Sequence, residues 1–171
     1  MSRRILDYHR IMDRVDIFTD GGCSGNPGPG GWAYVIISEG KVLSYSSGGE
    51  EQTTNNKMEL TAVIRAIEDS SVMGVSEMNI STDSQYVKNG ITTWIINWKK
   101  NGWRTASKDP VKNKDLWEKL DELNASNKIR WTWVKGHAGI KYNEMCDSLV
   151  RKEMESNIAE KTVSTVRPFR C

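Results

Sequence analysis

The sequence predicts a mixed α/β domain, in which a sheet of antiparallel and parallel strands is flanked by helices. Two observations carry this prediction. Near the start of the chain, three segments that alternate apolar and polar residues follow one another across glycine-containing turns, which is typical of an antiparallel meander. Further on, two more alternating segments are separated by stretches of helical periodicity, and strands joined through helices pair in parallel by right-handed crossovers.

The predicted strands are short and well marked. Residues 15–20 (VDIFTD) alternate up to an acid, and residues 31–37 and 42–45 complete the meander. Residues 78–82 and 129–133 supply the later strands, since their apolar side chains recur at every second position.

Helical periodicity marks the segments between and after these strands. Within residues 55–69, apolar residues recur at helical spacing at Leu60, Val63, Ile64 and Ile67. Met145, Leu149 and Val150 mark a closing helix.

The composition is that of one ordinary soluble globular domain. The 171 residues are 37% hydrophobic and 27% charged, and a chain of this length buries about 70% of its unfolded surface. We expect a domain over residues 14–156, with an N-terminal extension at 1–13 and a C-terminal tail at 157–171. No apolar run approaches the roughly 18 residues of a membrane span, so no membrane association is expected.

The N-terminal residues lack the apolar core of a secretory signal, and their acids argue against an organellar transit peptide. A cytoplasmic location is therefore expected. Cys23, Cys146 and Cys171 form an odd set without paired short spacing, so we expect reduced thiols rather than disulfides or a zinc site.

Positive charge is concentrated in one segment. The net charge of the chain is only +2, but residues 94–114 carry six basic residues against the single acid Asp109, a local charge of +5. The basic residues are Lys99, Lys100, Arg104, Lys108, Lys112 and Lys114.

Two acids end predicted strands, where a core has no use for them. Asp20 closes FTD and Asp83 closes STD. Ligands of open α/β sheets gather beyond the carboxyl ends of strands, and if the two strands are parallel neighbours these acids lie close together. Each also has a structural reading: Asp20 as a turn residue, and Asp83 beside Ser84 as a helix cap.

Two further acids lie on predicted helices. The helical neighbours of Glu59 are small and apolar, which places its carboxylate on a buried side rather than a solvated one. Asp147 repeats this pattern on the last helix. A favourable helix-dipole position for Glu59, or the edge of an amphipathic stripe for Asp147, is the structural alternative.

Carboxylates that meet in a partly buried place repel one another and bind protons. A divalent cation removes that repulsion, and all-oxygen ligation selects Mg²⁺ or Mn²⁺ over zinc. Such a centre, with two ions about 3.5–4 Å apart, can activate water in phosphodiester cleavage.

At this point the chain resembles a known family, the bacterial-type stand-alone ribonuclease H of type 1. The resemblance covers residues 15 to about 155 in the family's order. The matching segments are FTDGGCSGNPGPGGWAYV, TTNNKMELTAVIRAI, STDSQYVKNGITTWI, NWKKNGWRTASKDPVKNKDLW and WTWVKGHAGIKYNEMCDSLV.

The resemblance implies a five-stranded mixed sheet, three strands antiparallel and then two parallel, with a basic handle at about 94–114. It implies endonucleolytic hydrolysis of the RNA strand of an RNA–DNA hybrid, giving 5′-phosphate and 3′-hydroxyl ends, by a monomer that uses Mg²⁺ or Mn²⁺. His137 resembles the family's loop histidine, which takes part in positioning or protonation. The implied metal-binding and catalytic carboxylates are Asp20, Glu59, Asp83 and Asp147.

The resemblance also implies contacts with the hybrid. Short polar side chains suit the minor groove, where the 2′-hydroxyl distinguishes RNA from DNA, and handle cations suit phosphates. The implied substrate contacts are Cys23, Asn26, Thr54, Asn55, Asn56, Gln85, Lys99, Lys100, Arg104 and Lys112. The handle tryptophans are expected to pack rather than to stack on bases, with Trp94 left as a groove contact.

Departures from the family pattern are small. Gly22 replaces a common alanine, and Asp109 lies where the handle often has another basic residue. Ile140 and Tyr142 are unusual after the histidine loop. The alternatives are an integrase-like strand-transfer enzyme on the same fold and a non-catalytic hybrid-binding module.

Overall fold

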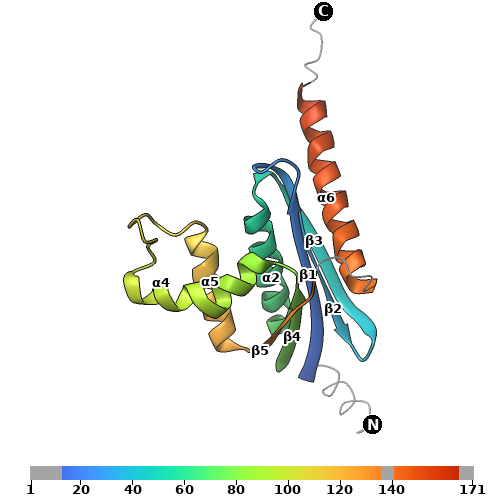
Figure 1. The fold of residues 1–171 in the computed structure, drawn as a ribbon. Coiled ribbons are helices and arrows are strands. Elements are labelled where there is room, and N and C mark those ends of the chain that lie inside the picture. Colours follow the sequence, from blue (N-terminus) through green and yellow to red (C-terminus); the bar gives the residue numbers. More distant parts are fainter. Residues whose placement is uncertain (1–12, 136–140, 166–171) are drawn as a thin grey trace, which may run out of the picture.

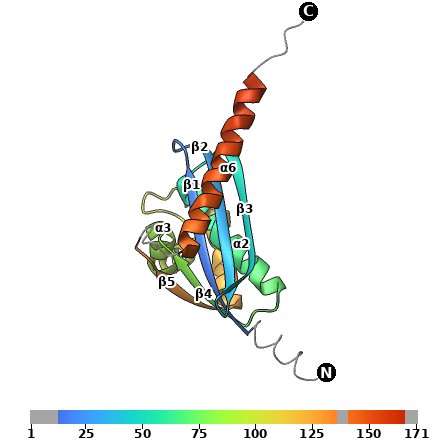
Figure 2. The same cartoon turned by 90° about the vertical axis from the view of Figure 1, so that its right-hand side faces the viewer.

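The structure is a computed structural model that describes residues 13–135 and 141–165, with side chains described as far as residue 158. Its centre is one five-stranded sheet in the order β3-β2-β1-β4-β5, with helices on both faces (Figures 1 and 2). The strands are β1 (Arg14–Cys23), β2 (Gly28–Ser38), β3 (Lys41–Thr53), β4 (Glu77–Thr82) and β5 (Lys128–Trp133).

The pairing confirms the predicted mixed sheet. β1, β2 and β3 pair antiparallel, whereas β1 with β4 and β4 with β5 pair in parallel. In the β1–β4 register, Phe18 lies opposite Ser81. Continuing this register by two residues puts Asp20 opposite Asp83, so both acids leave the sheet at the same edge.

The helices form two layers. α2 and α5 cover one face of the sheet and α6 covers the other, while α4 projects from the side (Figure 1). The segments are α2 (Asn55–Val72), α3 (Gln85–Asn89), the π-helical turn η1 (Gly90–Trp94), α4 (Ile95–Asn101), α5 (Lys114–Ser126) and α6 (Lys141–Thr165).

Side-chain caps start the helices next to the strand-end acids. The Thr54 hydroxyl accepts a hydrogen bond from the Lys57 N–H at 3.2 Å and caps α2. The Ser84 hydroxyl accepts from the Val87 N–H at 3.2 Å and caps α3. The predicted cap at Ser84 is confirmed, and a capping side chain satisfies a helix donor that has no partner within the helix.

The apolar side chains form two separate clusters, one on each face of the sheet. The larger lies between the sheet, α2 and α5, and its fully buried members include Ile17, Met58, Leu60, Ile80 and Trp117. The smaller lies under α6, and its buried members are Ala33, Val35, Ile37, Cys146 and Val150.

Trp98, Trp103 and Trp117 pack together, as predicted, and Trp94, which the sequence left open as a groove contact, packs against Trp98 as well. The Trp117 ring is fully buried and lies 5.5 Å from that of Trp98. Trp98 in turn lies 5.8 Å from Trp94 and 6.0 Å from Trp103. The aromatic chain therefore anchors the basic segment to the main core.

Most elements extend a few residues beyond their predicted ranges, and two extend much further. β3 extends to Thr53, through polar and glycine residues of weak strand signal, because β2 offers a hydrogen-bonding edge along that length. α6 continues to Thr165, past the predicted domain end at 156. No glycine or proline interrupts residues 141–165, so nothing breaks the helix there.

None of the helices within the described ranges is long and apolar enough to cross a membrane. Cys23 and Cys146 are free thiols, as predicted, and Cys171 lies outside the described residues.

Candidate metal centre

Three of the four predicted carboxylates meet at the edge of the sheet. Asp20 of β1, Glu59 of α2 and Asp83 after β4 each offer an oxygen atom, and these atoms all lie within 4.8 Å of one another. Residues 39 and 24 positions apart in the sequence are thus brought to one point by the parallel pairing of β1 and β4 and by the packing of α2 across β1.

A glycine allows α2 to come this close. A Cβ atom on Gly21 would lie 2.5 Å from the backbone nitrogen of Glu59, a separation that real Cβ atoms do not show. Any side chain at residue 21 would therefore push α2 away from β1, and the Glu59 carboxylate away from Asp20.

Glu59 is the buried member of the group, as its small apolar neighbours predicted. Its side chain is only 6% exposed, and Oε2 has no hydrogen-bond partner among the described residues. Burial raises the pKa of Glu59 well above its ordinary value, and the charges of Asp20 and Asp83 raise it further.

These properties fit a hard divalent cation. All the donors are carboxylate oxygens, the set that such cations prefer. A cation would neutralise the mutual repulsion of the three groups and give the buried Glu59 oxygen a partner. Asp20, Glu59 and Asp83 are therefore the residues that would hold it.

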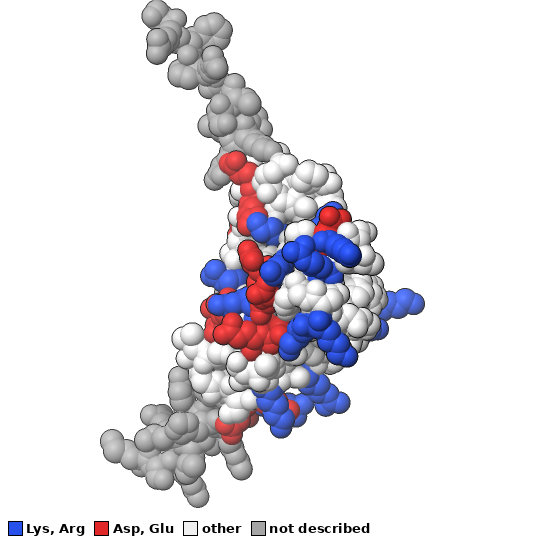
Figure 3. All heavy atoms as spheres, turned by 90° about the vertical axis from the view of Figure 1, so that its left-hand side faces the viewer, with Lys and Arg blue, Asp and Glu red and all other residues white. Residues whose placement is uncertain are grey.

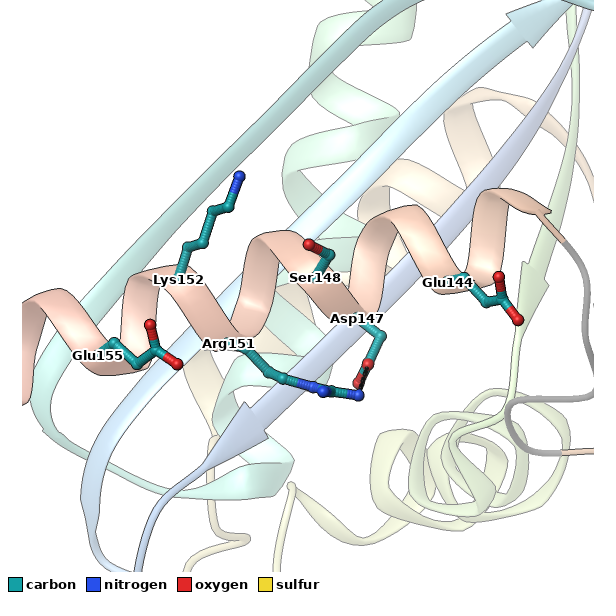
Figure 4. A pocket seen from close by; sticks show the side chains of 6 residues that line it. All are labelled: Glu144, Asp147, Ser148, Arg151, Lys152 and Glu155. Carbon is teal, nitrogen blue, oxygen red and sulfur yellow. Dashed lines mark hydrogen bonds and ion pairs between the residues drawn. The ribbon is translucent and has the colours of Figure 1, made fainter.

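Asp147 lies outside this group. It projects from α6, and its carboxylate accepts a hydrogen bond from the guanidinium of Arg151, one turn further along the helix. Figure 4 shows the two side chains turned toward each other, with Lys152 on the opposite side of α6.

Sequence reasoning missed Asn143. It lines a small hollow together with Thr19, Asp20 and Asp83. Its position one helical turn before Asp147 was the available signal, because residues four apart share a helix face.

Among the residues predicted to contact the hybrid near the metal centre, Asn26 and Asn55 are linked by a hydrogen bond. The Asn55 N–H donates to Asn26 Oδ1 at 3.2 Å, which ties the turn after β1 to the start of α2. The Cys23 sulfur lies 3.0, 3.4 and 3.3 Å from the carbonyl oxygens of Gly25, Gly28 and Thr53, and burial raises the pKa of its thiol.

Asn56 and Gln85 are exposed, and Thr54 is half-buried because it caps α2. His137 lies outside the described residues.

The handle cations differ in their surroundings. The Lys99 ammonium pairs with Asp121 of α5 at 3.2 Å. Lys100 and Arg104 line a groove with Trp94 instead, and Arg104 also donates to the Lys108 carbonyl at 3.0 Å. Lys112 borders a second groove, which is lined mainly by aromatic and apolar groups.

Charge is distributed unevenly on this side of the molecule. Acidic side chains gather at its middle, and lysine and arginine side chains lie on either side of them (Figure 3). A negative centre between positive flanks suits a cation beside a phosphate backbone.

A mixed five-stranded sheet with carboxylates at the ends of adjacent parallel strands, beside a basic handle, defines a metal-dependent nuclease of the ribonuclease H class. The chain matches the RNase H family over residues 12–155. It belongs to that family, which confirms the resemblance.

Curated relatives agree over nearly their whole length. The chain is 51% identical over 149 residues to a ribonuclease H of Treponema denticola, covering 79% of this chain and 93% of the relative. It is 53% identical over 141 residues to one of Nitrobacter hamburgensis, covering 82% and 91%. A third, from Rhizobium etli, is 51% identical over 153 residues, covering 90% and 99%.

Solved structures show the same fold. LC9-RNase H1, described as a type 1 RNase H with the type 2 active-site motif, is 29% identical with a TM-score of 0.75, covering 85% of this chain and 74% of that one. LC11-RNase H1, solved in complex with an RNA/DNA hybrid, is 27% identical with a TM-score of 0.62, covering 84% and 99%. The integrase-like and non-catalytic alternatives are not favoured.

Proposed function

We propose that Asp20, Glu59 and Asp83 hold the divalent cation, Mg²⁺ or Mn²⁺, with which this member of the ribonuclease H family cleaves the RNA strand of RNA–DNA hybrids. The observation that carries the assignment is the meeting of their three oxygens within 4.8 Å, where the buried Glu59 Oε2 has no hydrogen-bond partner among the described residues. The expected products carry 5′-phosphate and 3′-hydroxyl ends.

The cation, when bound, supplies positive charge that activates water and stabilises the leaving oxygen of the scissile phosphate. The protein contributes a fixed arrangement of ligands. Asp20 and Asp83 are set by neighbouring strands and Glu59 by a helix that Gly21 admits. Ligands held on rigid elements need little reorganisation during the reaction.

Two further groups complete the proposed machinery. Asp147 is the fourth carboxylate, one helical turn from Asn143, which lines the hollow beside Asp20 and Asp83. His137 is assigned a role in proton transfer, because an imidazole can exchange a proton near neutral pH.

Substrate selection is assigned to two surfaces. Asn26 and Asn55, joined by a hydrogen bond beside the metal centre, read the minor groove together with Cys23, Asn56 and Gln85. Thr54 holds a phosphate of the DNA strand. Lys100, Arg104 and Lys112 of the handle engage phosphates, with Trp94 beside them, and Lys99 acts as a weaker contact because Asp121 already pairs with it.

The test is cleavage of an end-labelled RNA–DNA hybrid beside single-stranded RNA of the same sequence, with Mg²⁺ and with chelator. We expect hybrid-specific cutting that chelator abolishes. Asp20→Asn should bind the hybrid and lose activity by about 10²–10³-fold or more, as when a key electrostatic group is removed from an active site.

Asp16→Asn is the matched control. Asp16 lies on the same face of β1, but its carboxylate accepts a hydrogen bond from Asn79 at 3.2 Å instead of facing the metal centre. Equal cutting of both substrates, cutting in chelator, or full activity of the Asp20 variant would refute the proposal.

We propose that the chain acts as a monomer, as the resemblance to the ribonuclease H family implies. Sedimentation velocity at micromolar concentration tests this, and a dimer would contradict it. The cytoplasmic location stays a prediction from the sequence.

A further inference from the structure

Asp147 has a partner that competes with any cation for its carboxylate. The Arg151 guanidinium donates to Asp147 Oδ2, and the carboxylate does not belong to the group formed by Asp20, Glu59 and Asp83. The ion pair joins two side chains of one helix, four residues apart, the spacing at which helical side chains meet.

We infer that Arg151 is a positioning residue that holds Asp147 away from the metal centre, and that it thereby sets the concentration of divalent cation at which the fourth carboxylate is recruited. The inference rests on the proposed function, because it takes Asp147 as a carboxylate of that centre.

The exposure of the Arg151–Asp147 ion pair indicates that it can break and re-form. The Arg151 side chain is 68% exposed and that of Asp147 is 21% exposed, so the guanidinium can move into water while the carboxylate stays near the protein surface. Exposed pairs of this kind are weak. A carboxylate held by such a partner can be released when a divalent cation competes for it.

The backbone under Asp147 is fixed, so only the side chain has to turn. The neighbouring Cys146 is fully buried, and its sulfur lies 3.4 Å from the carbonyl oxygen of Phe18 in β1, two residues before Asp20. One helical turn earlier, the Tyr142 ring lies 5.5 Å from that of Phe18. α6 is therefore anchored to the strand that carries Asp20, and a rotation of the Asp147 side chain decides which cation it meets.

Lys152 is the matched control for charge. It follows Arg151 on the same helix and is also exposed, but it points to the opposite side of α6 (Figure 4). Removing either residue changes the net charge of the chain equally. Only removal of Arg151 frees the Asp147 carboxylate.

The experiment is calorimetric titration of the full chain with Mg²⁺ in the absence of nucleic acid, at about 0.1 M salt. Arg151→Ala should tighten binding by about two- to fivefold, the range that corresponds to an exposed ion pair. Arg151→Lys should fall between this variant and the wild type, because a lysine keeps the charge but loses the planar fork. Lys152→Ala should leave the affinity nearly unchanged.

A double-mutant cycle shows whether the effect passes through Asp147. In an Asp147→Asn background, Arg151→Ala should no longer change the Mg²⁺ affinity. As a second readout, the NMR resonance of the Arg151 side-chain Nε–H should shift during the Mg²⁺ titration of the wild type. The same resonance should stay fixed in the Asp147→Asn variant.

Three results would overturn the inference: equal Mg²⁺ affinity of Arg151→Ala and the wild type, an equal gain in the Asp147→Asn background, or a raised KM for hybrid with no change in Mg²⁺ affinity. Failure of the proposed function looks different. In that case Asp20→Asn would bind Mg²⁺ as the wild type does, whatever the Arg151 variants show.

Discussion

Gly21 of β1 lies so close to Glu59 of α2 that a Cβ atom on residue 21 would be 2.5 Å from the Glu59 nitrogen. The contact is backbone to backbone, so no side-chain rotation relieves it. The distance between Asp20 and the buried Glu59 carboxylate therefore depends on a residue that carries no chemistry of its own.

Gly21→Ala is expected to destabilise the protein by about 1–3 kcal/mol, the usual range for overpacking in a closely packed interior, and to weaken Mg²⁺ binding. Urea unfolding and calorimetry measure the two effects. Gly22→Ala is the control, because its Cβ would meet side-chain atoms and no backbone: Val150 Cγ1 at 3.3 Å and the end of the Met154 side chain at 3.9 and 4.0 Å. Equal stability of the two variants would show that α2 can shift without penalty.

The raised pKa of Glu59 predicts a pH dependence of the metal-free protein. Burial, and then the charges of Asp20 and Asp83, raise this pKa above the ordinary value of 4.5. The folded state therefore binds a proton that the unfolded state has lost, and stability falls as the pH rises from about 4.5 through the folded-state pKa, then levels off.

Glu59→Gln should remove this fall. In chelator, the variant should have a higher Tm than the wild type at neutral pH and a similar Tm below pH 4.5. Added Mg²⁺ should stabilise the wild type more than the variant, which has lost a ligand. Thermal unfolding between pH 4 and 9 measures both effects, and parallel pH profiles in chelator would contradict the assignment.

The handle cations should contribute unequally to binding. The logarithm of the binding constant falls linearly with the logarithm of the salt concentration, and each phosphate contact that is lost makes this slope shallower by about 0.9. In a catalytically inactive Asp20→Asn background, which binds the hybrid without cutting it, Lys100→Ala and Arg104→Ala should each reduce the steepness of the salt dependence by this amount. Lys99→Ala should show a smaller decrease, because Asp121 already pairs with that lysine. Fluorescence anisotropy from 50 to 300 mM salt measures the slopes, and three equal decreases would argue against the difference.

Cys146 should resist alkylation in the folded protein. Its side chain is fully buried, and burial raises the pKa of its thiol to about 12, with a further contribution from the charge of Asp20. At pH 8 iodoacetamide should modify Cys23 before Cys146, and Cys146 should react only on addition of denaturant. Peptide mapping by mass spectrometry follows each thiol, and early modification of Cys146 would mean that α6 opens readily.

The parts of the fold predicted from the sequence are those written into local patterns. Period-two alternation gave the five strands, and an acid at the end of each of two strands predicted that Asp20 and Asp83 meet. The same dependence on local patterns explains why β3 was predicted too short. Its polar and glycine residues form a strand because β2 provides the hydrogen-bonding edge.

The sequence did not predict which charged side chains pair with one another. Lys99 and Lys100 are alike in the chain, and only the position of α5 brings Asp121 to one of them. Likewise, Asp147 has the same one-turn relation to Asn143 and Arg151 in the sequence, and only the structure shows that its carboxylate meets the arginine. The need for glycine at residue 21 depends on how closely a helix packs on a strand, which no short-range pattern encodes.

The parallel β1–β4 register ends at Phe18 and Ser81, two residues before Asp20 and Asp83, where neighbouring strands lie about 4.8 Å apart. The separation of these two acids is therefore independent of which apolar side chains fill the interior. Mutations that exchange core residues can accumulate without altering this separation, and a protein only 29% identical has the same fold. Evolutionary drift of the interior and preservation of the chemistry are compatible for this reason.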